Sequence, residues 1–320
     1  MKRFALAFTA LMLALAPAAA QDWPGKTVRI VVPFGAGSTP DIVARMLAEK
    51  LGQKYPASAI VVENKPGAGG NTGTDAVAKA DPDGSTIGIS IGGPLAINAI
   101  LFSKLPYDPK KDIAAVTQLV TMPSALVVST ALGVNSVAEL VALLKRDPGK
   151  YNFGSIGNGS LSHLSMEAIV LKSGAKMVHV PYASSPAAMT ALLRNDVQMA
   201  VLPAIAVTPH VASGNVKILA VSLPKRSAYL PEIPTLKESG VDVEADTWQG
   251  LIAPGGTPAA IVDKINKDVS EAIKTPAIRA KLAAQLMEPV GNSPAQFRAV
   301  IDGEITRWAP IIKAADVKIN

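Results

Sequence analysis

Short β-branched apolar runs alternate along the chain with segments whose apolar residues recur at helical spacing. The runs predict strands at residues 28–34, 59–62, 86–91, 113–120, 125–128, 177–180, 197–202 and 216–223. The helical spacing predicts helices at residues 41–51, 136–144, 161–171 and 186–193. Such alternation gives βα units and therefore an α/β fold with mostly parallel sheets. From residue 257 onward the pattern predicts helices only, the last over residues 295–314.

Two extended segments, residues 116–129 and 244–254, do not fit the βα repeat. The first is broken at Met122-Pro123, and the second follows a loop rich in proline and lysine. We interpret them as two crossings between lobes, which together form a hinge. A cleft between two α/β lobes is a natural ligand site, because strand ends and helix N-termini converge there. One lobe is expected to contain residues 21–121 plus 245–320, and the other residues 122–244.

The first twenty residues have the organisation of a secretory signal peptide. Lys2 and Arg3 form a basic start, residues 4–16 are almost wholly apolar, and Ala18 to Ala20 supply a small-residue cleavage site. The apolar stretch is too short for a permanent membrane span. Cleavage is expected after Ala20, which leaves an exported, unanchored protein, and we expect it in a periplasm. The chain has no cysteine, which excludes disulfides, thiolate metal sites and a lipid-attachment cysteine.

The charge balance is weak. Without the signal peptide, 29 Lys and Arg face 25 Asp and Glu, a net charge of +4, and no basic stripe is interleaved with aromatic residues. A nucleic-acid partner is therefore not expected. The three histidines, His163, His179 and His210, lack the spacing of metal ligands, so neither a metal nor a cofactor is expected.

The first candidate for ligand chemistry is PFGAGSTPD, residues 33–41, between a strand and a helix. Gly35 and Gly37 allow a tight turn, Thr39 is the expected N-cap, and Pro40 suits the first helical position. Free N–H groups at such a helix start attract an anion. An ordinary capped loop is the plainer alternative. A dinucleotide site is disfavoured, because Pro40 stands where the third glycine of that motif would be.

The second candidate is FGSIGNGSLSHL, residues 153–164, whose small turn residues again lead from a strand into a helix. Two such helix starts facing one cleft could hold one carboxylate from both sides. Ser160 is the expected N-cap and a donor to the ligand. His163, one turn into the helix, is either a ligand contact or a structural hydrogen-bonded histidine. A third glycine-rich loop, residues 64–73, either lines the cleft or merely turns the chain.

A catalytic alternative comes from GISIG, residues 88–92, which matches the GxSxG pattern of serine hydrolases. His179 and His210 follow downstream, in the order that such enzymes require. No His-Gly oxyanion motif precedes the serine, and Ser90 falls within a run that predicts a buried strand. A secreted serine hydrolase using Ser90 is kept as the alternative function.

Six segments in order give the chain a specific resemblance, which covers essentially all of it after the signal peptide. It resembles the substrate-binding proteins of tripartite tricarboxylate transporters, the Bug family. The segments are WPGKTVRIVVPFGAGSTPDIVAR (23–45), VVENKPGAGGNTGTDAVAKADPDGST (61–86), FGSIGNGSLSHL (153–164), VPYASSPAAMTALL (180–193), LPEIPTLKESGV (230–241) and TWQGLIAPGGTPAAIVDKIN (247–266).

The resemblance implies a two-lobed type II periplasmic-binding-protein fold without catalysis or cofactor. It implies a receptor, expected to be a monomer, that delivers a small organic acid to the membrane permease subunits of a tripartite transporter. Backbone N–H groups, hydroxyls and ordered water would hold one ligand carboxylate. The residues carried over are Phe34, Gly37, Ser38, Thr39 and Asp41 in the first loop, Ser155, Gly157, Asn158, Gly159, Ser160 and His163 in the second, and Tyr182 and Ala183 beside them.

The chain departs from the family pattern at two places. The first loop has a rearranged order, Gly37-Ser38-Thr39-Pro40-Asp41, in which Pro40 donates no hydrogen bond. After Pro-Tyr, the usual Lys-Gly-Gly-Gly is replaced by residues 183–186, ASSP, which removes a cation. The distal pocket is therefore expected to be apolar or neutral, and one ligand carboxylate is a firmer expectation than two.

Overall fold

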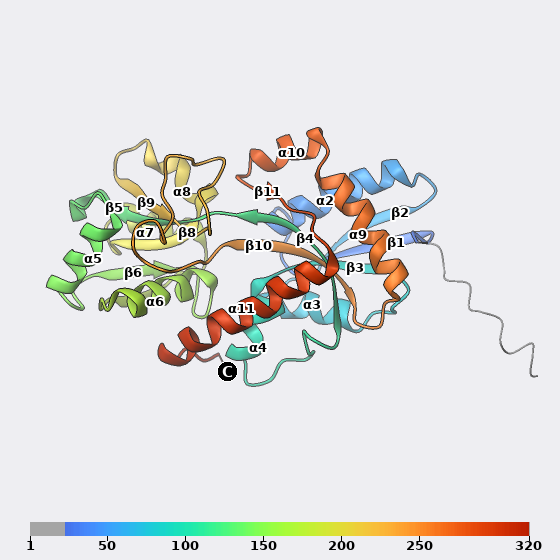
Figure 1. The fold of residues 1–320 in the computed structure, drawn as a ribbon, viewed down its shortest axis with the longest axis horizontal. Helices are drawn as coiled ribbons and strands as arrows, with labels where there is room; N and C mark the ends of the chain where they lie inside the picture. Colours follow the sequence, from blue (N-terminus) through green and yellow to red (C-terminus); the bar gives the residue numbers. More distant parts are fainter. Residues whose placement is uncertain (1–22, 320) are drawn as a thin grey trace, which may run out of the picture.

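The computed structural model describes residues 23–319 and contains two α/β lobes arranged end to end (Figure 1). The predicted signal peptide, residues 1–20, lies outside the described residues. The first sheet has six strands in the order β11-β4-β10-β3-β1-β2. They are β1 (Thr27–Val32), β2 (Ala59–Asn64), β3 (Thr86–Ile91), β4 (Ile113–Met122), β10 (Thr247–Pro254) and β11 (Glu288–Pro289).

The second sheet has five strands in the order β7-β6-β8-β5-β9. They are β5 (Ser124–Ser129), β6 (Asn152–Ser155), β7 (Val178–Pro181), β8 (Met199–Pro203) and β9 (Val216–Val221). The chain enters this sheet between β4 and β5, where Pro123 breaks the strand as predicted, and leaves it between β9 and β10. Both connections run between the lobes in Figure 1.

Both sheets are mixed, so the expectation of mostly parallel sheets is wrong. β1 pairs in parallel with β2 and β3, and β6 pairs in parallel with β7 and β8. β10 is antiparallel to β3 and β4, and β5 is antiparallel to β8 and β9. The antiparallel pairs arise because the crossing strands enter each sheet from the other lobe instead of through a helical crossover.

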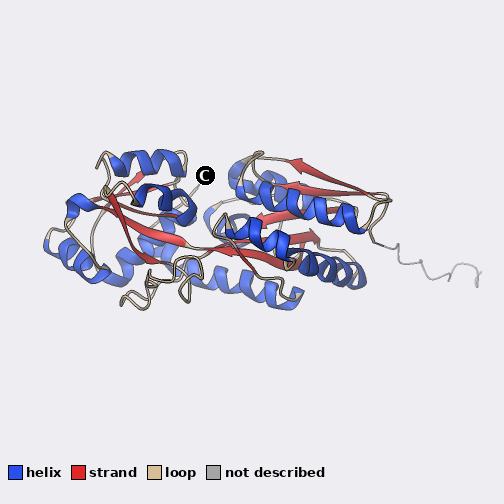
Figure 2. Cartoon of the chain, turned by 90° about the horizontal axis from the view of Figure 1, so that it is seen from above, coloured by secondary structure: helices blue, strands red, loops and turns tan. Residues whose placement is uncertain are grey.

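Helices cover both faces of each sheet (Figure 2). Along the first sheet, α2 and α9 pack on one face, and α3 and the start of α11 on the other. Along the second sheet, α5 and α6 pack on one face, and α7 and α8 on the other. The helices are α2 (Thr39–Lys54), α3 (Asn71–Ala78), α4 (Asn98–Leu101), α5 (Val137–Arg146), α6 (Leu161–Ser173), α7 (Ser185–Leu193), α8 (Ala204–Val211), α9 (Ala259–Ile273), α10 (Pro276–Ala283) and α11 (Pro294–Ala314). None of these described helices is long and apolar enough to cross a membrane.

The last helix, α11, packs against both lobes. Phe297, near its start, lies in the core of the first sheet beside Trp248. Trp308 and Ile312, near its end, lie in a core cluster with α6 of the second lobe. Leu101 of α4 belongs to the same cluster. Apolar packing therefore joins the lobes in addition to the two strand crossings.

The C-terminal region also differs from the prediction of helices only. A short strand, β11, pairs with β4 between α10 and α11. Two residues of strand leave no apolar alternation to detect, which explains the omission. The first strand ends at Val32 instead of residue 34, because Pro33 cannot donate to the sheet ladder.

Gly250 sets how closely α11 approaches the first sheet. A Cβ atom on Gly250 would lie 1.9 Å from Cζ of the buried Phe297. We expect Gly250→Ala to lower the free energy of unfolding by about 3 kcal/mol, because overpacking a core displaces its neighbours. Gly303→Ala on α11 is the control: its Cβ meets nothing within 4 Å, so better helix propensity should raise stability by about 1 kcal/mol. Urea unfolding measures both, and equal stability of Gly250→Ala and the native protein would contradict this packing.

Candidate functional site

The buried carboxylate of Asp41 holds the first glycine-rich loop in place through hydrogen bonds. Its Oδ2 accepts hydrogen bonds from the Gly37 N–H and from Arg45 Nε, both at 2.9 Å. Its Oδ1 accepts from Arg45 Nη2 at 3.0 Å and from Asn64 Nδ2 at 2.9 Å. Asn64 Nδ2 also donates to the Phe34 carbonyl at 2.9 Å. The buried carboxylate therefore ties together both ends of the loop and the end of β2.

These hydrogen bonds keep the Asp41 carboxylate charged. The bond from Arg45 is the largest cause that lowers the pKa of Asp41 to about 2, against the opposing effect of burial. The lone pairs of Asp41 face protein donors. Asp41 therefore acts by shaping the loop, and its carboxylate is not a group that would attract an anionic ligand.

At the start of α2, few backbone N–H groups are available to bind a ligand. Ser38 is the N-cap residue, so the prediction of Thr39 is wrong by one position, and Pro40 is the second helical residue instead of the first. The Ser38 N–H donates to the Gly35 carbonyl at 3.2 Å. Pro40 has no N–H, so Thr39 and Asp41 supply the backbone donors of the first turn.

The third glycine-rich loop lies directly against the first. A Cβ atom on Gly70, which has φ 96°, would lie 3.0 Å from the Phe34 ring and 2.7 Å from Pro94. Asn98 Nδ2 donates to Asn71 Oδ1 at 2.6 Å and fixes the loop to the turn after β3. Loops that follow β1, β2 and β3 thus meet at the carboxyl edge of the first sheet, where α/β proteins bind ligands.

The second loop satisfies most of its own polar groups. Ser160 is the N-cap of α6, as predicted: its Oγ accepts from the His163 N–H at 3.2 Å and donates to the Gly157 carbonyl at 2.7 Å. The Gly157 N–H donates to Ser155 Oγ at 3.2 Å, and the Gly159 N–H donates to His163 Nδ1 at 3.1 Å. Of the predicted donors in this loop, Asn158 is the exposed residue.

His163 forms structural hydrogen bonds within this loop, and its role toward a ligand stays a prediction. It is 4% exposed and stacks on His179 of β7, with ring centroids 3.7 Å apart. His179 Nε2 lies 2.7 Å from Ser155 Oγ. The sequence does not place His179 at this loop, because His179 lies sixteen residues beyond His163 and only the pairing of β6 with β7 brings it there.

The Tyr182 loop adjoins the second candidate loop. The Tyr182 N–H donates to the Ser155 carbonyl at 3.0 Å, and its ring lies close to Gly154. Ala183 is exposed, and Ser184 caps α7 by accepting from the Ala187 N–H at 3.3 Å. The ASSP sequence at residues 183–186 therefore begins a helix.

Ser90 has no catalytic setting. It lies fully buried within β3, and its hydroxyl pairs with that of Thr74 at 2.9 Å. The three histidines all belong to elements of the second lobe. The serine hydrolase alternative is therefore wrong, because the serine has neither a base nor access to substrate.

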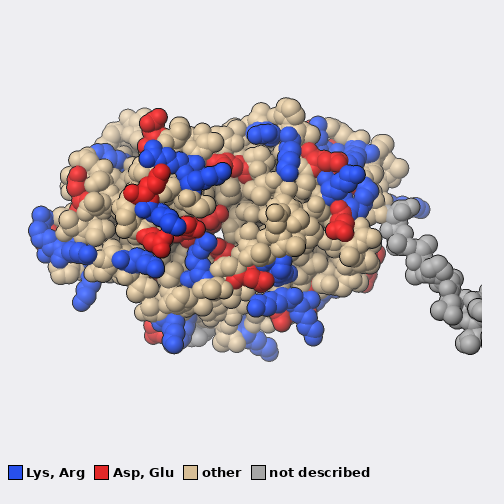
Figure 3. All heavy atoms as spheres, viewed as in Figure 1, with Lys and Arg blue, Asp and Glu red and all other residues tan. Residues whose placement is uncertain are grey.

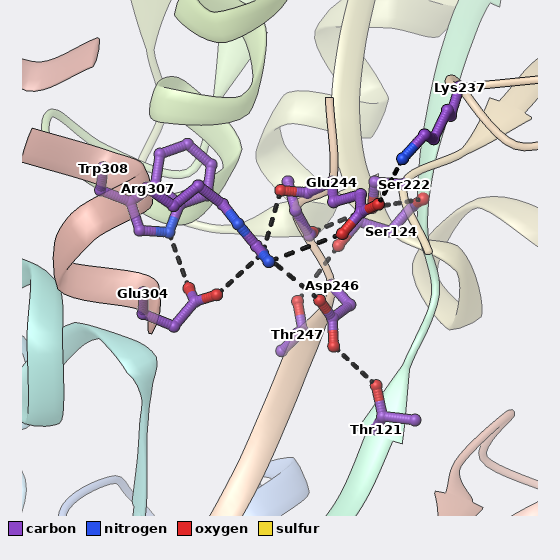
Figure 4. A network of polar contacts seen from close by, with 11 residues as sticks. Thr121, Ser124, Ser222, Lys237, Glu244, Asp246, Thr247, Glu304, Arg307 and Trp308 are labelled. Carbon is purple, nitrogen blue, oxygen red and sulfur yellow. Dashed lines mark hydrogen bonds and ion pairs between the residues drawn. The ribbon is translucent and has the colours of Figure 1, made fainter. Parts of the chain in front are cut away.

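A polar network surrounds the two crossings (Figure 4). Thr121 Oγ1 donates to Asp246 Oδ2 at 3.1 Å. Arg307 of α11 contacts Glu304 at 2.8 Å, Glu244 at 3.6 Å and Asp246 at 3.8 Å. Burial raises the pKa of Asp246, and it raises that of Glu304 to about 7, while the charge of Arg307 opposes both shifts. Residues of both lobes thus meet at one arginine.

A hollow of about 510 Å³ lies beside this network, between α11 and residues 223–226 of the second lobe. Acidic and basic side chains lie close together on this face of the molecule (Figure 3). The residues that line the hollow include none of the predicted ligand-binding residues. The hollow is therefore separate from the two glycine-rich loops, which we regard as the candidate ligand site.

The structure has two sheets, and each sheet presents glycine-rich loops and the start of a helix. Two extended crossings join the sheets. These features define a two-lobed binding protein. The family model for the tripartite tricarboxylate transporter family receptor matches residues 42–317. The chain belongs to this family of receptors, and the resemblance drawn from its six segments is confirmed.

Individual relatives are similar to this chain over nearly its whole length. Protein BugT of Bordetella pertussis is 35% identical over 307 residues, which cover 95% of this chain and 94% of BugT. The solved structure of Rpa4515 from R. palustris, with adipate, is 33% identical with a TM-score of 0.80, covering 93% of this chain and 99% of that one. MatC (Rpa3494) from Rhodopseudomonas palustris, with bound malate, is 30% identical with a TM-score of 0.74, covering 91% and 100%.

Asp41→Asn tests the brace of the first loop. The amide would turn a donor toward Gly37 or Arg45, so we expect the free energy of unfolding to fall by about 2 kcal/mol. Asp316→Asn is the matched control, because Asp316 and Lys318 form an ion pair in which their side chains are 81% and 75% exposed, and this change should alter stability by less than about 0.5 kcal/mol. Urea unfolding at neutral pH compares the two variants. Equal losses would show that Asp41 is an ordinary surface ion pair.

Proposed function

We propose that this protein is a periplasmic receptor that binds a small organic acid between its lobes and delivers it to the permease subunits of a tripartite tricarboxylate transporter. The observation that carries the proposal is the pair of helix starts, α2 and α6, each preceded by a braced glycine-rich loop. Helix N-termini stabilise anions through free N–H groups and the helix dipole. Membership in the receptor family supports the same function.

Within this proposal, the ligand carboxylate meets the amides that the loops leave free. These are the amides of Thr39 and Asp41 in the first lobe and those of Asn158 and Leu161 in the second. The side chains of Phe34, Ser38, Ser160 and Tyr182 border the same space. Gly37, Ser155, Gly157, Gly159 and His163 act indirectly, because their hydrogen bonds fix the two loops.

The proposed lobes are residues 21–121 plus 245–320 and residues 122–244, with the hinge at the two crossings. Closure would turn one lobe against the other about Pro123 and Asp246. The contact of Trp308 and Leu101 with α6 would limit the rotation, because apolar packing holds that end of the cleft together. We further propose export by a signal peptide cleaved after about Ala20, and a monomeric receptor without a cofactor or enzymatic activity.

The ligand class follows from the loops and from the relatives. Rpa4515 has been solved with adipate and MatC with malate, both of which are dicarboxylic acids. In this chain residues 183–186 of the Tyr182 loop include no Lys or Arg, and they begin a capped helix. We propose that one carboxylate is bound by the two helix starts, and that the remainder of the ligand lies in a neutral pocket.

Adipate, its monomethyl ester and its dimethyl ester test this assignment in a thermal-shift assay. Ligand at 100 times its dissociation constant stabilises a protein by about 2.7 kcal/mol, which raises Tm by roughly 4 °C in a chain of this size. We expect adipate and the monoester to raise Tm and the diester to leave it unchanged. Malate provides a second acid. A shift with the diester equal to that with adipate would overturn carboxylate recognition.

A further inference from the structure

Two histidines fix alternate glycines of the second loop. His163, in the first turn of α6, accepts the Gly159 N–H at Nδ1. His179, on β7, reaches Ser155 Oγ, which in turn accepts the Gly157 N–H. The loop between β6 and α6 has no regular secondary structure of its own. Its shape therefore depends on side-chain hydrogen bonds, in which these two imidazole rings take part together with Ser155 and Ser160.

The Gly159 bond determines the protonation state of His163. Because Nδ1 accepts a hydrogen bond, it carries no proton, and the neutral ring must carry its proton at Nε2. Nε2 lies 3.5 Å from Glu167 Oε1, one helical turn further along α6, which suits that tautomer. A second proton could enter only at Nδ1, where it would face the Gly159 N–H. Protonation of His163 therefore breaks the hydrogen bond that holds Gly159.

The stacking of the rings also disfavours positive charge. The ring planes of His163 and His179 are inclined by 9°, and their centroids are 3.7 Å apart. The ring centroid of Phe153, on β6, lies 5.0 Å from that of His179. Two cations cannot share this spacing without strong repulsion. Burial, followed by the charge of His163, lowers the pKa of His179 to about 4, and Glu167 opposes this shift. Glu167 is the carboxylate that acts on the pair.

We propose that His163 and His179 are positioning residues that hold the second ligand-binding loop in its binding shape only while both rings are neutral. This inference rests on the proposed function, since it assigns the loop between β6 and α6 to the ligand. Its consequence is a receptor that releases its acid on acidification. If the loop can bind its ligand only without an added proton, the affinity for the acid must fall as the pH decreases. The fall is at most about tenfold per pH unit for one proton.

The chain allows a variant with the same hydrogen bonds and no titration. Asparagine places its amide oxygen near the position of Nδ1, so His163→Asn can still accept from Gly159. Glutamine places its amide near the position of Nε2, so His179→Gln can still pair with Ser155. His210→Gln on α8 is the matched control, because His210 is remote in sequence from the loop and belongs to another face of the lobe.

The first test needs no ligand. Amide NMR spectra of the ligand-free protein are recorded from about pH 7.5 to about pH 3.5, a range that covers ordinary histidine titration and the pKa of about 4 of His179. We expect the Gly157 and Gly159 signals to shift with pH in the native protein and in His210→Gln, and to stay unchanged in His163→Asn/His179→Gln. Glycine signals that stay unchanged while the imidazole nitrogens of His163 and His179 titrate would overturn the proposal.

The second test uses adipate in calorimetry at about pH 7 and about pH 4, an interval that reaches the pKa of about 4 of His179. Protonation of adipate lowers the affinity of every variant by the same factor. We expect the affinity of the native protein to fall at least about twofold more than that of His163→Asn/His179→Gln, because half of the His179 rings are protonated at their pKa. An equal fall would overturn the coupling. The single variant His163→Asn, with circular dichroism as a check of folding, replaces the double variant if that one does not fold.

The two tests separate this inference from the proposed function. If no organic acid binds the native protein at neutral pH, the proposed function fails, while the glycine signals still decide whether the histidines control the loop. If acid binds and the glycine signals do not follow the histidines, the proposed function stands and this inference fails.

Discussion

Both candidate loops face the same constraint: an irregular backbone must keep one shape while some of its N–H groups stay free for a ligand. An unpaired buried N–H costs about as much as a lost hydrogen bond, so side chains accept hydrogen bonds from loop amides such as those of Gly37, Gly157 and Gly159. Asp41 does this in the first lobe, with Arg45 and Asn64 as its partners. His163 and His179 do it in the second, through Gly159 and Ser155. The residue types differ, but in both lobes a buried side chain accepts a hydrogen bond from a backbone N–H of the loop.

The sheet topology gathers the loops of each lobe, and the proposed function requires the two sets to face a common space. Loops after β1, β2 and β3 meet at one edge of the first sheet, and the loops after β6 and β7 meet in the second. Between the sheets, the crossings are bound to each other through Thr121 and Asp246, and α11 lies across both lobes. In the proposed closure, the lobes would therefore move about a hinge that is held by hydrogen bonds and by the ion pairs of Arg307 with Glu244 and Glu304.

Much of this architecture could be predicted from the pattern of apolar residues. The break at Pro123, the strand at Thr86–Ile91 and the Ser160 cap depend on local chemistry, and each was located correctly. The antiparallel pairs could not be predicted, because strand direction depends on which lobe the chain comes from. Likewise, nothing near His179 in the sequence indicates that β-sheet pairing brings it beside His163. Thr39 was assigned the cap that belongs to Ser38, since both residue types suit the position.

The central claim is that the two loops hold one acid together, and hydrogen–deuterium exchange with and without saturating adipate tests it most directly. Binding between the lobes must order both helix starts at once, because each supplies part of the same site. We predict slower exchange in peptides that cover residues 35–42 and in those that cover residues 156–163, with the same dependence on adipate concentration. Protection of one loop alone, or of the hollow beside α11 instead, would contradict a shared carboxylate site.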